Sequence, residues 1–333
     1  MKKNLIEFRK DIVSGDWVLI SATTQKKPIF FKPKDSTPLS QDLCPFDNPA
    51  KSGQESPLLW LPKPKKNDIK DWWVQIFPNK FPVVMDSRVC PPLEFDGKYH
   101  HKTGVGFQEV VVTRDHKRHI GLMKENEIVT LVEAYTARYQ ALRAEPCVEY
   151  ILIFHNNGAR AGASVPHPHS QILAIPIIPP DVARSLRGSD EYHKKNKKCV
   201  HCDIIKWEIK EKKRIIFEND LFVAIAPFAS KVAFEIRIFP KIHESRFEVI
   251  DEKQKETLAH AMQTIFYRIF KKLKNPDYNF FIHTLPPKDK NGGHYHWHIE
   301  VLPRLTIWGG LELGAGIEVV KFSPEEASKF LRK

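Results

Sequence analysis

The chain reads Asn156-Asn-Gly-Ala-Arg-Ala-Gly-Ala-Ser-Val-Pro-His-Pro-His-Ser-Gln171 near its middle, and an apolar run continues from there to Ile178. His167, His169 and Gln171 alternate where this run begins. Alternate residues of a β-strand point to one face, so two imidazoles and an amide would lie side by side after a glycine-rich loop. An exposed edge strand is a poor alternative, because the run is apolar. Imidazole on such a face can serve as a nucleophile, a general base or a metal ligand.

The same order of features occurs twice along the chain. Each half has a cysteine motif, a strand ending in histidine, an amphipathic helix, a second strand ending in histidine and a His-x-His strand. His167 follows His116 by 51 residues, and His296 follows His243 by 53. The first half contains Cys44–Asp47, His116, the helix at 128–142, His155 and His167–Gln171; the second contains Cys199–Cys202, His243, the helix at 258–273, His283 and His296–Glu300.

This duplication predicts an α+β protein. Each unit is expected to be an antiparallel sheet with its helix packed on one face. We place the first unit at residues 1–188 and the second at 189–333, with the charged stretch 187–198 as the junction. The apolar stripes of the two helices are expected to face the core and not to form cofactor sites.

Composition narrows the classes of function. The 333 residues contain no apolar run of 18 or more, so no membrane span is expected. The net charge of +12 admits nucleic-acid binding, but the lysine clusters lack the interleaved aromatic residues of a base-stacking surface, and we expect no nucleic-acid partner. Five cysteines without a signal peptide favour a reducing cytoplasm and metal binding over a disulfide framework.

Two motifs connect the chain to a known family. Gly162-Ala-Ser-Val-Pro-His-Pro-His-Ser-Gln171 and the tail Leu311-Glu-Leu-Gly-Ala-Gly-Ile317 resemble the galactose-1-phosphate uridylyltransferase family of the histidine-triad superfamily, including its ADP-glucose phosphorylase-like relatives. The resemblance begins near Ile20 and covers nearly the whole chain. It implies a duplicated histidine-triad-like unit that moves UMP from UDP-glucose to galactose 1-phosphate by a ping-pong mechanism, through a covalent nucleotidyl-histidine. The alternatives are an ADP-glucose phosphorylase-type adenylyltransferase and a zinc-stabilised nucleotide-binding protein without turnover.

His169 is our candidate nucleophile. Nucleotidyl transfer needs a group that attacks phosphorus and later leaves, and imidazole does both when one ring nitrogen is held in place. The backbone carbonyl of His167 could hold it. Gln171 lies on the same strand face and could donate to a phosphate oxygen. The resemblance implies that this glutamine marks transferases, because hydrolytic relatives carry a third histidine there.

Substrate contacts are expected from several loops. Glycine lets backbone N–H groups approach a phosphate closely, and Ser164 adds a hydroxyl. The resemblance implies that the tail reaches the sugar through Glu312 near the partner subunit of a homodimer. Lys27 lies in a loop where the family usually has paired arginines, so the bidentate contact to phosphate is lost. The substrate-binding residues that the resemblance implies are Asn79 (alternatively a turn residue between strands), Lys80, Asn156, Gly162, Ala163, Ser164, Gln171, Lys27 and Glu312.

The second half predicts a zinc site. Cys199 and Cys202 have the spacing of a metal knuckle, and a structural zinc takes four nitrogen or sulfur ligands. His243 and His296 occupy the repeat positions that complete the set. His294 shares the strand face and is the alternative, but His296 aligns with His167.

The first half predicts a weaker zinc site. The family often has Cys-x-x-Cys where this chain has Cys44-Pro-Phe-Asp47, and a carboxylate is also a legitimate zinc ligand. Cys44, Asp47, His116 and His167 would form the set; otherwise Asp47 is a turn residue and the site is lost. The repeat favours His116 over His119. Relatives with an iron site would use His283 and His298, but the matching glutamate after the first strand is missing, so we expect no iron.

Overall fold

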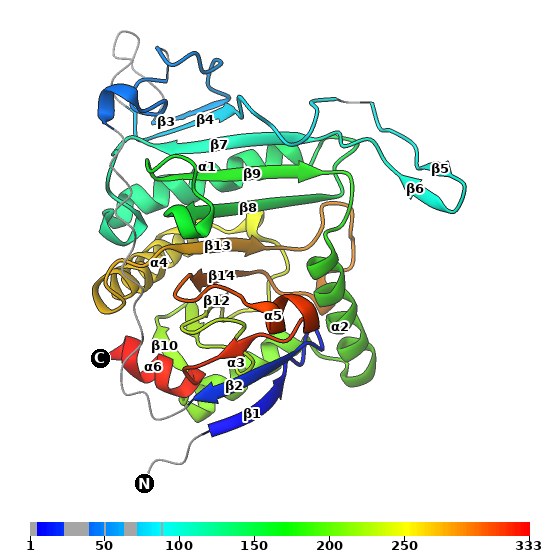
Figure 1. The fold of residues 1–333 in the computed structure, drawn as a ribbon, viewed down its shortest axis with the longest axis vertical. Helices are drawn as coiled ribbons and strands as arrows, with labels where there is room; N and C mark the ends of the chain where they lie inside the picture. The colour runs from blue at the N-terminus through cyan, green and yellow to red at the C-terminus, as the bar shows by residue number, and fades with distance from the viewer. Residues whose placement is uncertain (1–4, 23–39, 50, 63–71, 88) are drawn as a thin grey trace.

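The computed structural model describes residues 5–22, 40–49, 51–62, 72–87 and 89–333. Lys27 therefore lies outside the described residues, and its expected contact with phosphate stays a prediction. The chain builds one large sheet with helices packed on it, and a small sheet attached to the second half (Figure 1).

The large sheet has ten strands, and every neighbouring pair is antiparallel. Strands β8 (Tyr150–Asn157) and β13 (Tyr278–His283) pair at its centre and join the two halves, with Asn156 opposite Asn279. Five strands of each half therefore continue into one sheet. Their order is β10 (Ile215–Glu218), β11 (Phe222–Ile225), β12 (Ile236–Pro240), β14 (His298–Pro303), β13 (Tyr278–His283), β8 (Tyr150–Asn157), β9 (His169–Ile175), β7 (Phe107–Thr113), β4 (Val74–Pro78) and β3 (Leu59–Leu61).

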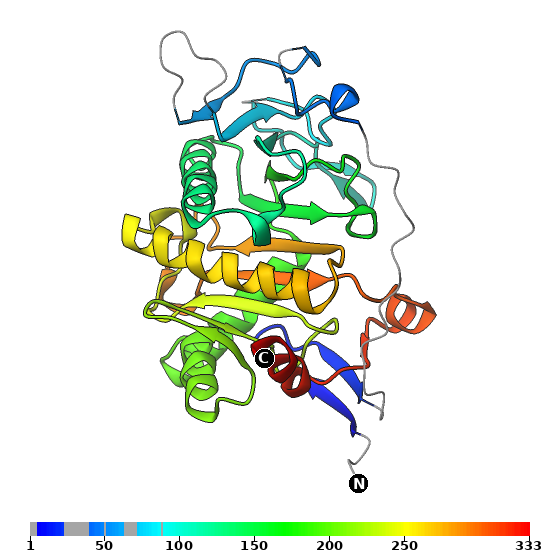
Figure 2. The same cartoon turned by 90° about the vertical axis from the view of Figure 1, so that its left-hand side faces the viewer.

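Two long helices cover one face of this sheet (Figure 2). They are α1 (Glu125–Leu142) and α4 (Glu252–Lys272), and α4 is capped by Asp251, whose side chain accepts from the N–H of Gln254. Their apolar stripes pack on sheet residues such as Val111, Ile172 and Ile299, all fully buried. The duplicated α+β fold predicted from the sequence is confirmed. Because the core occupies this face, the alternate residues of the same strands are left for chemistry on the other face.

The small sheet belongs to the second half. It combines β1 (Leu5–Lys10) and β2 (Trp17–Ala22) with β15 (Val319–Val320). Buried Arg9 pairs with Glu325 at 3.0 Å, and Asp11 pairs with Arg237 at 3.2 Å. The start of the chain therefore packs on the second unit, although its position in the sequence places it in the first. The remaining described helices of eight or more residues are α2 (Pro180–Asn196), α3 (Val200–Glu211) and α6 (Pro324–Arg332). The expected boundary between the units, at residue 188, falls within α2.

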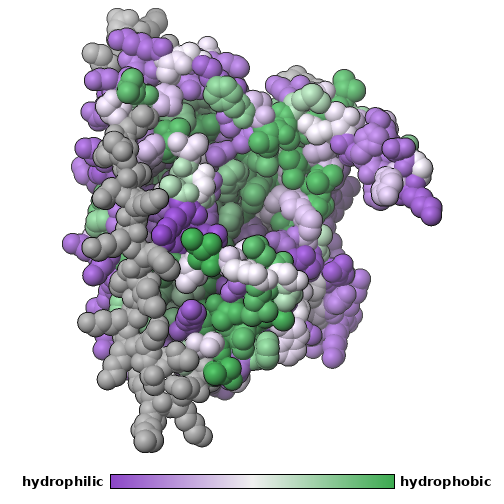
Figure 3. All heavy atoms as spheres, viewed as in Figure 1, coloured by the Kyte–Doolittle hydropathy of each residue, from purple (hydrophilic) through white to green (hydrophobic). Residues whose placement is uncertain are grey.

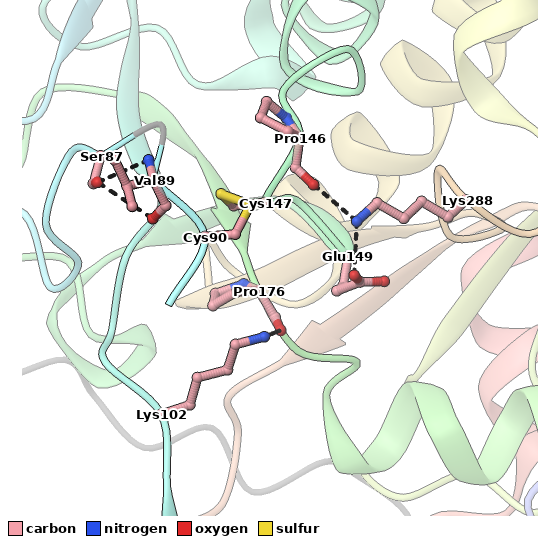
Figure 4. The surroundings of a disulfide bond; sticks show 9 residues. All are labelled: Ser87, Val89, Cys90, Lys102, Pro146, Cys147, Glu149, Pro176 and Lys288. Carbon is pink, nitrogen blue, oxygen red and sulfur yellow. Dashed lines mark hydrogen bonds and ion pairs between the residues drawn. A yellow bond between two sulfur atoms is a disulfide. The ribbon is translucent and has the colours of Figure 1, made fainter. Parts of the chain in front are cut away.

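An arm leaves the body between β4 and β7 and ends in the hairpin of β5 (Glu94–Asp96) and β6 (Tyr99–His101) (Figure 1). Cys90 at its base forms a disulfide with Cys147, at a Cα–Cα distance of 5.0 Å (Figure 4). The expectation that the cysteines serve metal rather than disulfides is therefore wrong for this pair. The sequence gives no sign of it, because the two residues lie 57 positions apart and meet only where the base of the arm reaches the segment between α1 and β8.

The face seen in Figure 1 exposes both polar and apolar side chains (Figure 3). Phe81, Val83 and Met85, which lead from β4 toward the arm, are exposed. Among the described residues, no helix combines the length and the apolar character that a membrane crossing needs.

Candidate functional site

His169 is the first residue of β9, and its side chain is buried. Its Nδ1 lies 2.8 Å from the carbonyl oxygen of His167, so Nδ1 donates and Nε2 keeps its lone pair. Burial lowers the pKa of His169, although the bond to His167 opposes this shift. The ring is therefore held as the neutral tautomer that a nucleophile at phosphorus requires.

Phe46 packs against this ring, with centroids 5.0 Å apart. Phe46 lies between Cys44 and Asp47, so the loop that carries two candidate metal ligands also packs against His169. Sequence reasoning missed this residue, because only the folded chain brings the loop near 46 onto β9. A metal bound by Cys44 and Asp47 would therefore also restrain the phenyl ring that packs against His169.

Gln171 projects from the same face of β9 as His169 and contacts the neighbouring strand. The side-chain NH2 of Gln108, on β7, donates to Gln171 Oε1 at 2.7 Å. Gln108 Oε1 in turn accepts from the backbone N–H of Val83 at 2.7 Å. Gln108 was not among the expected site residues, because β7 and β9 are distant in sequence.

The glycine-rich loop follows β8 and folds on itself. Asn279, from the second half, donates to Asn156 Oδ1 at 2.8 Å and to the carbonyl of Ala161 at 2.7 Å. The NH2 group of Asn156 is thereby directed toward Gly162 and not toward Asn279. A Cβ at Gly158, where φ is 87°, would meet the carboxylate of Asp277 at 2.1 Å, so this turn requires glycine.

Two expected phosphate donors of this loop are already used. The N–H of Gly162 donates to the carbonyl of Ala159 at 3.0 Å, and the N–H of Ala163 donates to that of Gly158 at 3.1 Å. The loop closes through short turns that consume these groups, so Ser164 and Asn156 are the remaining candidates there.

Asn79 and Lys80 lie where β4 leaves the sheet. Asn79 Oδ1 accepts from the N–H of Phe81 at 3.0 Å, which is a turn role for this side chain. The Lys80 ammonium is exposed and lies 3.5 Å from the carbonyl of Ser52. The structure thus supports the turn alternative for Asn79, and nucleotide contacts by either residue stay predictions.

Glu312 lies elsewhere in the chain. It is in α5 (Gly310–Ala315), and its carboxylate accepts from the N–H of Gly309 at 2.9 Å. It lines a cavity of about 650 Å³ together with His298 and Glu300, in the second half, and not with His169. Within one chain the structure therefore does not place Glu312 in the same cavity as His169.

The predicted second metal site is assembled in the structure. Ligand atoms of Cys199, Cys202, His243 and His296 lie within 4.8 Å of one another. Cys202 Sγ is 3.4 Å from His243 Nδ1 and 3.5 Å from His296 Nδ1. Zinc bonds of ~2.3 Å to sulfur and ~2.0–2.1 Å to nitrogen give a tetrahedral edge of roughly 3.5 Å. The four residues therefore fit zinc.

The histidine tautomers agree with this fit. His296 Nε2 donates to the carbonyl of Pro240 at 3.0 Å, and His243 Nε2 donates to that of Gly292 at 3.3 Å. Each Nδ1 lone pair is thereby directed at the cysteines, as in carbonyl-oriented metal ligands. His294 is not in the cluster.

The first cluster is also assembled, with a carboxylate in place of one thiolate. Asp47 Oδ2 is 2.5 Å from His116 Nδ1 and 3.7 Å from His167 Nδ1, and Cys44 Sγ is 3.5 Å from the latter. His167 Nε2 donates to the carbonyl of Thr113 at 2.6 Å, which frees Nδ1 for a metal. Burial raises the pKa of Cys44 to about 11, so only a cation would hold it as a thiolate.

His119, the alternative to His116, has another role. It lies outside both clusters, and its ring is buried against Phe270 with centroids 4.9 Å apart. Burial lowers the pKa of His119 to about 4, as expected for a neutral core histidine.

A third group combines His283, His298 and Glu300, whose ligand atoms also lie within 4.8 Å of one another. Glu300, which occupies the repeat position of Gln171, was not among the ligands expected from the sequence. The expectation that no iron is bound stays a prediction.

Comparison with known proteins agrees with this geometry. The family models "Galactose-1-phosphate uridyl transferase, N-terminal domain" and "C-terminal domain" match residues 3–179 and 185–307. ADP-glucose phosphorylase of Arabidopsis thaliana is 32% identical, over 98% of this chain and 92% of that protein. Galactose-1-phosphate uridylyltransferase of Thermotoga maritima is 27% identical, over 99% of this chain and 98% of that protein.

Solved structures give the same picture. The A. thaliana ADP-glucose phosphorylase with bound ADP-glucose superimposes with a TM-score of 0.82 at 30% identity, covering 99% of both chains. A uridylyltransferase superimposes with a TM-score of 0.73 at 27% identity, covering 98% of this chain and 97% of the other. The chain therefore belongs to the galactose-1-phosphate uridylyltransferase family and is a nucleotidyltransferase.

Proposed function

We propose that the protein transfers a nucleotidyl group between sugar 1-phosphates or phosphate by double displacement, through a covalent intermediate on His169. The observation that carries the proposal is the bond from His169 Nδ1 to the carbonyl of His167, because it presents the Nε2 lone pair of a neutral ring. The second half repeats this contact between His298 Nδ1 and the carbonyl of His296, at 3.2 Å, but has Glu300 where the first half has Gln171. The neutral amide beside His169 is therefore the feature that favours this ring as the nucleophile.

In the first step, His169 Nε2 attacks the α-phosphorus of the nucleotide sugar. The N–P bond forms, the P–O bond to the β-phosphate breaks, and sugar 1-phosphate leaves with the electron pair. In the second step, a phosphate oxygen of the acceptor attacks the same phosphorus and the N–P bond breaks. The NH2 group of Gln171 donates to a non-bridging oxygen in both steps, where charge accumulates. Zinc at the two clusters would orient the surrounding loops and takes no part in these steps.

Replacing Gln171 with histidine is expected to raise hydrolysis of the intermediate, relative to transfer, by about tenfold or more. Imidazole can activate water, whereas an amide cannot. The measurement is the ratio of free nucleoside monophosphate to transferred nucleotide. Gln171→Leu is the control, because it lowers transfer without adding a base. A hydrolysis ratio in Gln171→His no higher than in the parent would contradict the role of the amide.

Two donors are candidates. UDP-glucose with galactose 1-phosphate as acceptor is the pair that the sequence motifs favour. ADP-glucose is the second candidate, because the A. thaliana ADP-glucose phosphorylase is 32% identical to this chain, compared with 27% for the T. maritima uridylyltransferase. A phosphorylase would use inorganic phosphate as acceptor and release a nucleoside diphosphate.

The deciding experiment labels the intermediate. The protein is incubated with UDP-glucose or ADP-glucose, each radiolabelled at the α-phosphorus, and is then denatured. Acid-labile label on His169 identifies the donor, and a chase with galactose 1-phosphate or inorganic phosphate identifies the acceptor. Stable nucleotide binding without label from either donor would contradict the transferase and support the non-catalytic alternative.

We also propose a homodimer in which Glu312 of one copy contacts the sugar bound at His169 of the other. Support comes from the place of Glu312 in a different cavity of its own chain and from the exposed apolar residues Phe81, Val83 and Met85. Sedimentation equilibrium tests this, and a monomer at micromolar concentration would contradict it. A cytoplasmic location stays a proposal, against which the disulfide counts, because disulfides are rare in reducing compartments.

A further inference from the structure

We propose that Gln108 is a positioning residue that sets which end of the Gln171 amide meets the transferred phosphate. This inference rests on the proposed function, because it concerns the same site. It starts from the 2.7 Å bond between Gln108 Nε2 and Gln171 Oε1 and the 2.7 Å bond between Val83 N–H and Gln108 Oε1.

The direction of this chain of amides is fixed by a backbone group. Oxygen and nitrogen of a glutamine amide are normally interchangeable by rotation. A backbone N–H is only ever a donor, so the atom of Gln108 that faces Val83 must be the oxygen. Its NH2 group then faces Gln171, which must present its oxygen in reply. The NH2 group of Gln171 is thereby left to donate to the phosphate.

Gln108 also connects the Gln171 amide to the turn at 79–83. Its backbone carbonyl accepts from the N–H of Asn79 at 2.7 Å, while its side chain accepts from Val83. Both ends of the turn that carries Lys80 are therefore held by one residue. A shift of this turn would be transmitted to the Gln171 amide through two hydrogen bonds.

In the second half, carboxylates occupy the positions that correspond to Gln108 and Gln171, and a cation lies between them. Arg237 pairs with Glu300 as Val110 pairs with Gln171, so Glu300 is the counterpart of Gln171 and Glu235 that of Gln108. Arg237 bridges the two glutamates, at 3.0 Å from Glu235 and 3.7 Å from Glu300. In the first half this bridging position is Val110, so a second acceptor at 108 would have no cation between it and Gln171.

The test compares Gln108→Glu with Gln108→Met. A glutamate still accepts from Val83 but offers Gln171 only acceptor oxygens, so the Gln171 amide must rotate and turn its oxygen toward the phosphate. We expect kcat to fall by about 10²-fold, the usual loss when a donor to a developing charge is removed. Methionine removes the contact without reversing it and is expected to cost about tenfold or less. Gln263→Glu, on α4 across the sheet, is the matched control for an added carboxylate.

If Gln108 had only a structural role, Gln108→Met would be the more damaging variant, because glutamate preserves the shape and the Val83 contact that methionine loses. A greater loss of activity and of thermal stability in Gln108→Met would therefore overturn the proposal. In a Gln171→Met background, the kcat values of Gln108→Glu and Gln108→Met should differ by less than about threefold. A persisting difference would assign the effect to the negative charge of the introduced carboxylate and also overturn the proposal.

Binding provides an independent readout if neither donor labels the protein. Calorimetry of UMP and AMP, compared with uridine and adenosine, measures the phosphate contact without turnover. Gln108→Glu should weaken the monophosphate by about tenfold and leave the nucleoside unchanged. Absence of label with this pattern would reject the transferase and retain the positioning role. An unchanged monophosphate affinity would reject the positioning role whether or not the protein turns over.

Discussion

Replacing His169 with asparagine is expected to abolish nucleotidyl transfer, with a fall of roughly 10⁴-fold or more in exchange of label between nucleotide sugar and sugar 1-phosphate. The change removes the only nitrogen that forms the covalent bond. Asparagine keeps a side-chain NH2 that can donate to the carbonyl of His167, so the local bond at 2.8 Å has a replacement.

Fold and nucleotide affinity should stay close to those of the parent. The NH2 of the new side chain also reduces the cost of placing a polar group in this buried position. Thermal unfolding and calorimetry with the nucleoside monophosphate check these points. His260→Asn, on the exposed side of α4, is the control for loss of an imidazole. Exchange at more than about one-hundredth of the parent rate in His169→Asn would contradict the covalent step on this residue.

The sequence alone identifies the residues whose role depends on local spacing. His167, His169 and Gln171 share a face because they alternate in one strand, and Cys199 and Cys202 share a turn of chain. The repeat then predicts His116, His243 and His296, because the two halves have the same order of elements. The predicted metal clusters and the duplicated fold follow from this periodicity.

The residues that the sequence does not reveal reach the site through strand pairing. Gln108 meets Gln171 because β7 pairs with β9, and Asn279 meets Asn156 because β13 pairs with β8 across the junction of the halves. Phe46 reaches His169 only when its loop folds over the sheet. Such contacts depend on register between distant segments, which a single sequence does not encode in any local pattern.

The two metal sites should respond differently to loss of a ligand, and the larger effect is expected in the second half. Cys199→Ser with Cys202→Ser should remove one equivalent of zinc and lower stability by several kcal/mol, on the order of 10 °C in Tm for a chain of this size. All four positions there are filled by protein, so the metal is structural and its loss should reduce stability before chemistry.

Asp47→Ala is the comparison for the first half, where a carboxylate replaces a thiolate and zinc affinity is expected to be lower. The experiment must separate access to the metal from affinity for it, because Cys44, His116 and His167 are buried whereas His243 is exposed. Zinc in the first site should therefore exchange slowly even if it binds more weakly, and brief chelation would rank the sites by access. Elemental analysis after long dialysis against a zinc buffer ranks them by affinity. Full zinc occupancy in the double cysteine variant would contradict the assignment of Cys199, Cys202, His243 and His296, whatever its activity.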